Sequence, residues 1–231
     1  MTELIPAIIP QSFDEIKQKI KLLEPFIFRQ DGEEPFIRSV QLDIMDGKFV
    51  ESTTWNNPEE LKSFSEPVNF EAHLMVENPE IYVENWLYSG VVRIITHIEA
   101  TTDPDLLIKL CHDAGIQYGI ALNPETSNEK IISWIDKVDE ILFLAVKPGR
   151  GGQEFQKPVL DKIKKLRSRY LNVKIGVDGG IKVGIARQVK EAGADMVIAG
   201  SAIFKAPNIG NALMALVRDK IEVISKPHIR L

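Results

Sequence analysis

Three residues whose side chains could transfer protons or bind a metal, Asp43, His73 and Asp178, each lie at or near the end of a short apolar run. Carboxylates and imidazoles are the usual groups for both tasks. Because side chains alternate along a strand, Gln41 and Asp43 point to the same face if their run is a strand. If the three runs are strands of one barrel, these side chains can converge at its carboxyl end.

Each of these residues also has an ordinary structural interpretation. An aspartate at the end of a strand commonly forms a turn or caps a helix. A single histidine is usually a hydrogen-bonded structural residue. His97 and Glu99 form a second polar pair at the end of another run, whereas His112 and His228 are expected at the surface or in packing. The individual residues therefore do not establish a site by themselves.

Glycine-rich loops follow the last three apolar runs and predict a phosphate site. They contain Gly149, Gly151, Gly152 and Gln153, then Gly179 and Gly180, then Gly200 and Ser201. Glycines leave backbone N–H groups accessible, and phosphate binds such loops in α/β barrels. One such loop is weak evidence because glycine also forms tight turns, but three on successive runs favour a common phosphate site. Lys147 and Arg150 either add charge there or are solvated.

Apolar runs rich in Ile and Val alternate with longer amphipathic stretches, which is typical of βαβ units and a parallel sheet. The predicted strands are 4–9, 37–43, 68–75, 91–98, 116–122, 140–146, 173–178 and 196–199. The predicted helices are 12–23, 58–64, 79–88, 104–114, 128–135, 158–170, 182–191 and 208–224. Eight strands, each followed by a helix, favour a closed (β/α)8 TIM barrel over an open doubly wound sheet. No Gly-x-Gly-x-x-Gly follows the first strand, which disfavours a dinucleotide site.

The composition limits the other possibilities. With 231 residues and 44% hydrophobic residues, the chain is expected to form a single barrel domain over 1–231, with 28–35 as a longer surface loop. The net charge of −5 disfavours nucleic acid and anionic membranes as partners. A single cysteine, Cys111, excludes an internal disulfide and is expected on a buried helix face. The start of the sequence resembles neither a signal peptide nor a membrane span, so we expect a cytoplasmic protein.

The ordered motifs resemble those of the ribulose-phosphate 3-epimerase family. They are Asp43-Ile44-Met45-Asp46-Gly47, His73-Leu74-Met75-Val76, Asn123-Pro124-Glu125-Thr126, Pro148-Gly149 with Gly151-Gly152-Gln153, Val177-Asp178-Gly179-Gly180-Ile181 and Gly200-Ser201-Ala202-Ile203-Phe204. The set extends over nearly the whole chain. The resemblance implies a barrel that interconverts ribulose 5-phosphate and xylulose 5-phosphate in the pentose phosphate pathway.

The resemblance also implies roles for individual residues. Asp43 and Asp178 match the two acid–base catalysts, and His73 and the glycine loops match residues that contact the phosphorylated substrate. Asp43, His73 and Asp178 match ligands of a divalent metal such as zinc, iron or manganese, which polarises the C2 carbonyl. No organic cofactor is implied, and the family suggests a homodimer.

The sequence departs from the family pattern at several of these positions. Gln41 replaces the first metal-binding histidine, and an amide oxygen is a poorer ligand than imidazole for zinc or iron. Ala7 replaces a substrate-contacting serine, and Leu144 replaces a methionine of the pocket. The remaining departures are Lys48, Glu51, Lys147 and Arg150.

These residues are compatible with three functions. The first is an epimerase acting on ribulose 5-phosphate or a related phosphosugar. The second is a hexulose-phosphate synthase or orotidine-phosphate decarboxylase, which needs Asp-x-Lys-x-x-Asp where this chain has Gln41, Asp43 and Asp46. The third is a phosphosugar-binding barrel without catalysis, which Ala7 and Gln41 would favour.

Overall fold

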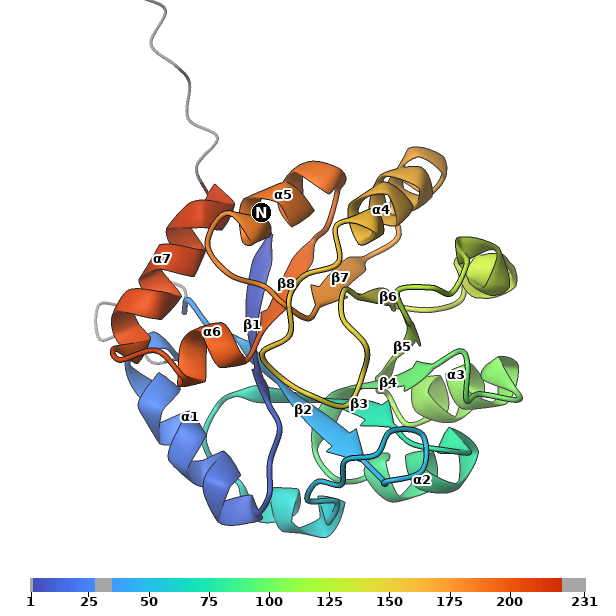
Figure 1. Cartoon of the computed structure of the whole chain (residues 1–231). Coiled ribbons are helices and arrows are strands. Elements are labelled where there is room, and N and C mark those ends of the chain that lie inside the picture. Colours follow the sequence, from blue (N-terminus) through green and yellow to red (C-terminus); the bar gives the residue numbers. More distant parts are fainter. Residues whose placement is uncertain (1, 28–34, 222–231) are drawn as a thin grey trace, which may run out of the picture.

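The computed structural model describes residues 2–27 and 35–221 and forms a closed barrel of eight parallel strands (Figure 1). Each strand pairs with its neighbours in the sequence, and β8 pairs with β1. The strands are β1 (Glu3–Ile8), β2 (Ser39–Met45), β3 (Asn69–Met75), β4 (Val91–His97), β5 (Gln117–Leu122), β6 (Glu140–Leu144), β7 (Ile175–Asp178) and β8 (Met196–Ala199). The predicted TIM barrel is therefore confirmed.

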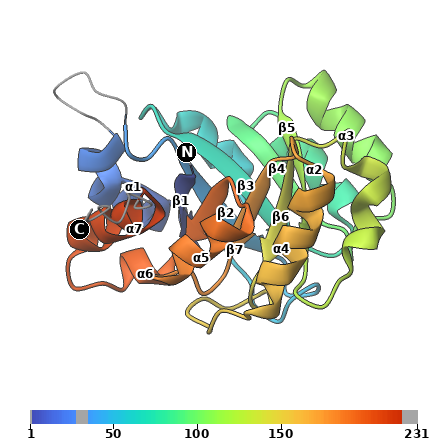
Figure 2. The same cartoon turned by 90° about the horizontal axis from the view of Figure 1, so that it is seen from above.

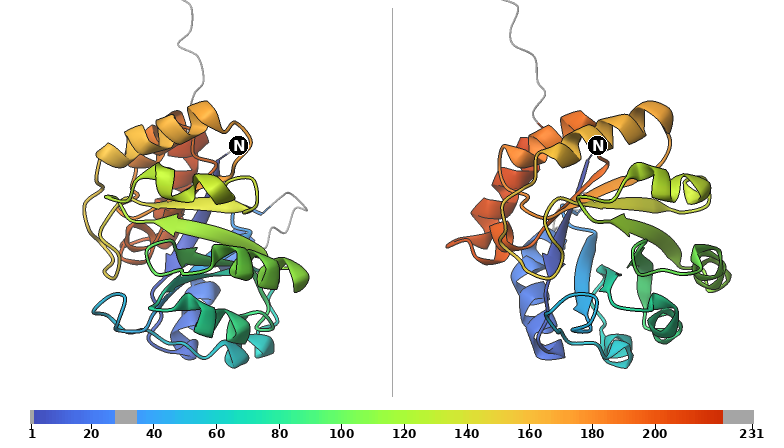
Figure 3. Two further views of the ribbon diagram at one scale, coloured as in Figure 1. Left: turned by 90° about the vertical axis from the view of Figure 1, so that its right-hand side faces the viewer. Right: turned by 45° about the vertical axis from the view of Figure 1, so that its right-hand side comes forward.

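Helices surround the ring of strands (Figures 1 and 3). They are α1 (Phe13–Ile27), α2 (Pro79–Trp86), α3 (Pro104–Asp113), α4 (Pro158–Arg169), α5 (Ile185–Ala192), α6 (Ser201–Phe204) and α7 (Ile209–Ile221), with two 3-10 helices, η1 (Pro58–Ser63) and η2 (Asn128–Trp134). The short α6 was not predicted from the sequence. Most of the predicted loop 28–35, the end of the last predicted helix and His228 lie outside the described residues.

The bounds of some elements differ from the sequence prediction. Helix α1 continues beyond position 23 because its buried residues Ile16, Ile20, Leu23 and Ile27 keep a helical spacing. Strand β2 begins two residues later than predicted and continues to Met45, which pairs with Met75 of β3. Asp43 therefore lies inside the paired strand rather than at its last residue.

The register between strands determines which side chains are neighbours inside the barrel. Gln41 pairs with Glu71, and Asp43 pairs with His73, so the residues of each pair point inward side by side. A small apolar cluster fills much of the remaining interior: Ile5, Ala7, Ile95, Ala121, Leu142, Leu144, Met196 and Ile198. A larger apolar core lies between the strands and the helices and includes Cys111, which is buried as predicted.

The carboxyl ends of all strands face the same end of the barrel, where α6 and the gold loop after β6 also lie (Figure 2). His112 of α3 is exposed at the surface, as expected, and its Nε2 lies 2.8 Å from Asp139 Oδ2. Among the described residues, none of the helices combines the length and the apolar character needed to cross a membrane.

Candidate active site

A pocket of about 340 Å³ opens at the carboxyl ends of the strands. Asp43 of β2, His73 of β3 and Asp178 of β7 line it, together with the loops that follow β6, β7 and β8. The three chemically competent residues selected from the sequence therefore share one pocket with the predicted phosphate loops.

Gln41 lies between the two carboxylates. Its amide nitrogen Nε2 donates one hydrogen bond to Asp43 Oδ1 and one to Asp178 Oδ2, each 2.8 Å long. His73 Nδ1 lies 3.0 Å from Asp43 Oδ1 and 3.9 Å from Asp178 Oδ2. Gln41 and His73 are both fully buried. The structure thus brings the four residues together, with the amide of Gln41 bridging the aspartates.

The surroundings of Asp178 in the pocket change the pKa of its carboxyl group. Burial, and next the negative charge of Asp43, raise the pKa of Asp178 to about 7, although His73 and hydrogen bonds from Gln41 and the Gly179 N–H lower it. Two carboxylates held close together in a poorly solvated site resist being ionised at the same time. A carboxyl group with this pKa can take up or release a proton near neutral pH, which is the property required of a general acid or base.

Asp43, His73 and Asp178 also fit a divalent cation. One ligand atom from each lies within 4.8 Å of the other two. Two carboxylate oxygens and an imidazole nitrogen are a donor set that divalent metals accept. The Oε1 atom of Gln41 is buried and has no hydrogen-bond partner among the described residues. Gln41 becomes a fourth ligand only if its amide oxygen and nitrogen exchange places.

The predicted phosphate residues line the other part of the pocket. They are Gly149, Gly151, Gly152, Gln153, Gly179, Gly180, Gly200 and Ser201. At Gly180, φ is +67° and an added Cβ would lie 2.5 Å from the backbone nitrogen of Phe155, so the two loops pack too closely for a larger residue. Gln153 differs from the glycines because its amide nitrogen donates to the carbonyl oxygens of Lys147 and Arg150. It therefore holds the loop after β6 in a closed turn.

Lys205 lines the same pocket and was not selected from the sequence. Its Nζ lies 3.7 Å from the position that a Cβ on Gly152 would occupy. Its signal in the sequence is its spacing of four residues from Ser201, about one helical turn. Arg150 also lines the pocket, but its Nη2 lies 3.3 Å from Glu51 Oε2, so its charge is shared with a carboxylate. Lys205 is therefore a further positive charge beside the pocket.

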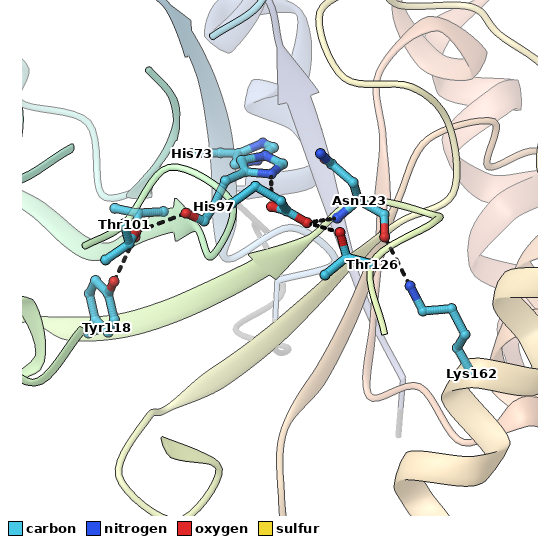
Figure 4. A network of polar contacts seen from close by, with 9 residues as sticks. His73, His97, Thr101, Tyr118, Asn123, Thr126 and Lys162 are labelled. Carbon is cyan, nitrogen blue, oxygen red and sulfur yellow. Dashed lines mark hydrogen bonds and ion pairs between the residues drawn. The ribbon is translucent and has the colours of Figure 1, made fainter. Parts of the chain in front are cut away.

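His97 and Glu99, the second polar pair of the sequence, continue a series of contacts from His73 Nε2, the ring nitrogen that does not face Asp43. Figure 4 shows His73 and His97 together. His73 Nε2 lies 2.9 Å from His97 Nε2, and His97 Nδ1 lies 3.3 Å from Glu99 Oε2. Although burial alone would raise it, hydrogen bonds from His97, Thr126 and the Asn123 backbone N–H lower the pKa of Glu99 to about 2. The sequence alone did not indicate this connection to the pocket.

Comparison with known proteins agrees with this geometry. Residues 5–204 match the family described as "Ribulose-phosphate 3 epimerase family". The chain belongs to the ribulose-phosphate 3-epimerase family. The ribulose-phosphate 3-epimerase of Synechocystis is 34% identical over 93% of this chain and 93% of its own length. That of Schizosaccharomyces pombe is 34% identical over 72% of this chain and 75% of its own length, and that of Escherichia coli K12 is 34% identical over 73% and 78%.

Solved structures of more distant proteins share the fold. A 3-hexulose-6-phosphate synthase from Salmonella typhimurium superposes with a TM-score of 0.68 at 13% identity, covering 95% of this chain and 98% of that one. KGPDC from Streptococcus mutans superposes with a TM-score of 0.67 at 18% identity, covering 95% and 97%. At these identities the likeness shows the barrel and nothing about the reaction.

Proposed function

We propose that this chain inverts carbon 3 of ribulose 5-phosphate to give xylulose 5-phosphate, and catalyses the reverse reaction. The observation that supports this most directly is the pair Asp43 and Asp178, which come from different strands, line one pocket and are bridged by one amide. Inversion without an organic cofactor requires one proton to leave carbon 3 and another to arrive on the opposite face. Two carboxyl groups from separate strands can supply this pair.

The two aspartates exchange roles with the direction of the reaction. One carboxylate removes the C3 proton, the electrons of that C–H bond form the C2–C3 double bond, and the π electrons of the C2 carbonyl move onto its oxygen to give a cis-enediolate. The other aspartate, in its protonated form, returns a proton to carbon 3 from the opposite face. Because the pKa of Asp178 is about 7, this residue is available in either form near neutral pH.

Gln41 and His73 complete the polar surroundings of the aspartates. The two N–H groups of the Gln41 amide hold the carboxylates in a fixed relation and stabilise negative charge on either one. A divalent cation held by Asp43, His73 and Asp178 would polarise the C2 carbonyl and stabilise the enediolate. Gln41 would be a weaker fourth ligand for zinc or iron than the histidine that the family resemblance implies.

The substrate phosphate is proposed to lie among the glycine loops after β6, β7 and β8. The backbone N–H groups of Gly180, Gly200 and Ser201 are suited to an anion at this end of the barrel. Lys205, which lines the same pocket, would add a charge-assisted contact.

Isotope exchange tests the proposal. Ribulose 5-phosphate is incubated with the protein in deuterated water, with and without added zinc, iron or manganese, and deuterium at carbon 3 is followed by NMR. We expect deuterium incorporation together with formation of xylulose 5-phosphate. Binding of the sugar phosphate without exchange under every metal condition would refute the proposal.

A second candidate is a phosphosugar-binding barrel without catalytic activity. It is favoured by Ala7, which lines the pocket where the family resemblance implies a serine that contacts substrate, and by Gln41. It predicts tight binding of ribulose 5-phosphate with no deuterium at carbon 3. The same exchange experiment therefore separates the two candidates.

A further inference from the structure

The hydrogen bonds behind His73 decide which of its ring nitrogens carries a fixed proton. Nδ1 faces Asp43 at 3.0 Å, and Nε2 faces His97 Nε2 at 2.9 Å. Both imidazoles are fully buried, and their ring planes differ by 23° with centroids 5.1 Å apart. One nitrogen of the contact between them must donate and the other must accept. The tautomer of His97 therefore determines that of His73.

Glu99 sets the direction of this chain of hydrogen bonds. Its Oε1 accepts from the backbone N–H of Asn123 at 2.9 Å and from the hydroxyl of Thr126. Its Oε2 faces His97 Nδ1 at 3.3 Å. A backbone N–H can only donate, and a carboxylate whose Oε1 already accepts two hydrogen bonds stays ionised, so its Oε2 can only accept. His97 consequently donates from Nδ1, which leaves its Nε2 as an acceptor.

The backbone around these donors is held in place by neighbouring side chains (Figure 4). Lys162 Nζ donates to the carbonyl oxygens of Asn123 and Pro124 at 2.9 and 3.0 Å. The Thr101 hydroxyl donates to the carbonyl oxygen of His97 at 2.8 Å. These contacts fix the ends of β4 and β5, so the donors to Glu99 keep their orientation.

We propose that Glu99 and His97 are positioning residues that hold a proton on Nε2 of His73, so that the Nδ1 atom facing Asp43 and Asp178 carries a lone pair. Nδ1 can then accept the proton of a protonated aspartate or bind a cation. The importance of this for turnover rests on the proposed function, whereas the tautomer itself is a property of the folded chain.

The test is NMR of the full chain labelled with ¹⁵N-histidine, which reports which ring nitrogen carries a proton. The sequence has four histidines, so His97→Asn and His112→Asn variants assign the signals. In the wild type we expect a proton on Nδ1 of His97 and on Nε2 of His73.

Glu99→Gln is expected to reverse the donor–acceptor direction of the hydrogen bonds that connect residue 99, His97 and His73. The Asn123 N–H keeps the amide oxygen on its side, so the amide NH₂ faces His97 Nδ1 and donates to it. His97 then donates from Nε2, and the proton of His73 moves to Nδ1. We expect kcat for C3 exchange to fall by about 10- to 100-fold, as is typical when the partner of a site histidine is removed. KM is expected to stay within about threefold, because Glu99 does not line the pocket.

Glu129→Gln is the matched control, since it removes the same charge from an exposed carboxylate of η2. It should leave both tautomers and turnover unchanged. A wild-type His73 with its proton on Nδ1 overturns the inference even if Glu99→Gln does not fold. Unchanged tautomers in a folded Glu99→Gln variant overturn it as well. The expected tautomers in a wild type without epimerase activity would support this inference while refuting the proposed function.

Discussion

Two groups of polar side chains lie inside the barrel, one toward each end of the strands. The carboxyl-end group is Gln41, Asp43, His73 and Asp178, and the amino-end group is Glu71, Arg93 and Glu140. On β3 the two groups are only two residues apart, because Glu71 and His73 both point inward. The same alternation along the strand therefore gives each group a buried ionisable side chain.

The two groups differ in what compensates their negative charge. In the amino-end group, Arg93 Nη1 lies 2.7 Å from Glu71 Oε2 and 2.9 Å from Glu140 Oε2. In the carboxyl-end group, the donor between the two carboxylates is the neutral amide of Gln41. A fixed cation suits a structural role, whereas a neutral bridge in an open pocket leaves the aspartates able to exchange protons.

Substitution of either aspartate in the carboxyl-end group should remove turnover. Asp43→Asn and Asp178→Asn should each lower kcat by about 10²- to 10⁴-fold, because an amide can neither accept nor deliver the C3 proton. The measurement is deuterium exchange at C3 of ribulose 5-phosphate. Activity within about tenfold of wild type in either variant would contradict the two-aspartate mechanism.

Glu71→Gln is the matched control in the amino-end group. It makes the same chemical change in a residue that does not line the pocket. Turnover should remain close to the wild-type value, and a large loss would show that the two groups are functionally coupled.

Substitution of Arg93 should mainly affect stability. Arg93→Met leaves Glu71 and Glu140 buried without their cation, and we expect a loss of about 3–5 kcal/mol in the free energy of unfolding. Urea denaturation at pH 9, above the pKa of about 8 of Glu71, measures it. Lys137→Met breaks the exposed pair with Asp105, 2.6 Å long, and should cost less than about 1 kcal/mol. Equal losses of unfolding free energy in the two variants would show that a buried ion pair in the amino-end group contributes no more to stability than an exposed one.

An imidazole at position 41 should strengthen metal binding in the carboxyl-end group and leave the amino-end group unchanged. Gln41→His is expected to tighten zinc binding by at least about tenfold, because zinc favours nitrogen donors and a closed ligand set. Calorimetry with zinc alone gives the dissociation constant. Gln188→His adds an imidazole at an exposed position of α5 and should change nothing. Tight stoichiometric metal in the wild type would show that Gln41 is already an adequate ligand.

The amino-end group should also make stability depend on pH. Burial, and next the charge of Glu140, raise the pKa of Glu71 from 4.5 to about 8, although Arg93 opposes them. Between these values the folded chain binds more protons than the unfolded chain, so stability falls as pH rises. The contribution is complete below pH 4.5 and is lost as pH passes through about 8.

Denaturation curves between about pH 5 and 9 test this dependence. Glu71→Gln should reduce the loss of stability with rising pH, with a remainder from Glu140, whose pKa burial also raises. Parallel stability profiles of the wild type and this variant would show that Glu71 titrates normally in the folded chain.

Much of the fold could be predicted from the sequence because the signals are local. Alternating apolar runs and amphipathic stretches predicted all eight strands in their order, and the motifs placed Asp43, His73 and Asp178 near strand ends. The glycine loops were predicted to share one place for the same reason, since the carboxyl ends of parallel strands meet at one end of a barrel. The short helix α6 was missed because four residues are too few to show a helical period.

The contacts between these residues depended on the tertiary structure. Alternation along one strand says which residues point inward, but the register between strands decides which of them share a layer. Only the register could place the Gln41 amide between two carboxylates, or Arg93 between Glu71 and Glu140. The Glu140 side chain fits beside Gly176 only because this residue has no side chain, since a Cβ there would lie 2.2 Å from Glu140 Oε1. The sequence by itself thus determined the barrel and the chemical groups at its carboxyl end, and the closure of the strands decided their hydrogen-bond partners.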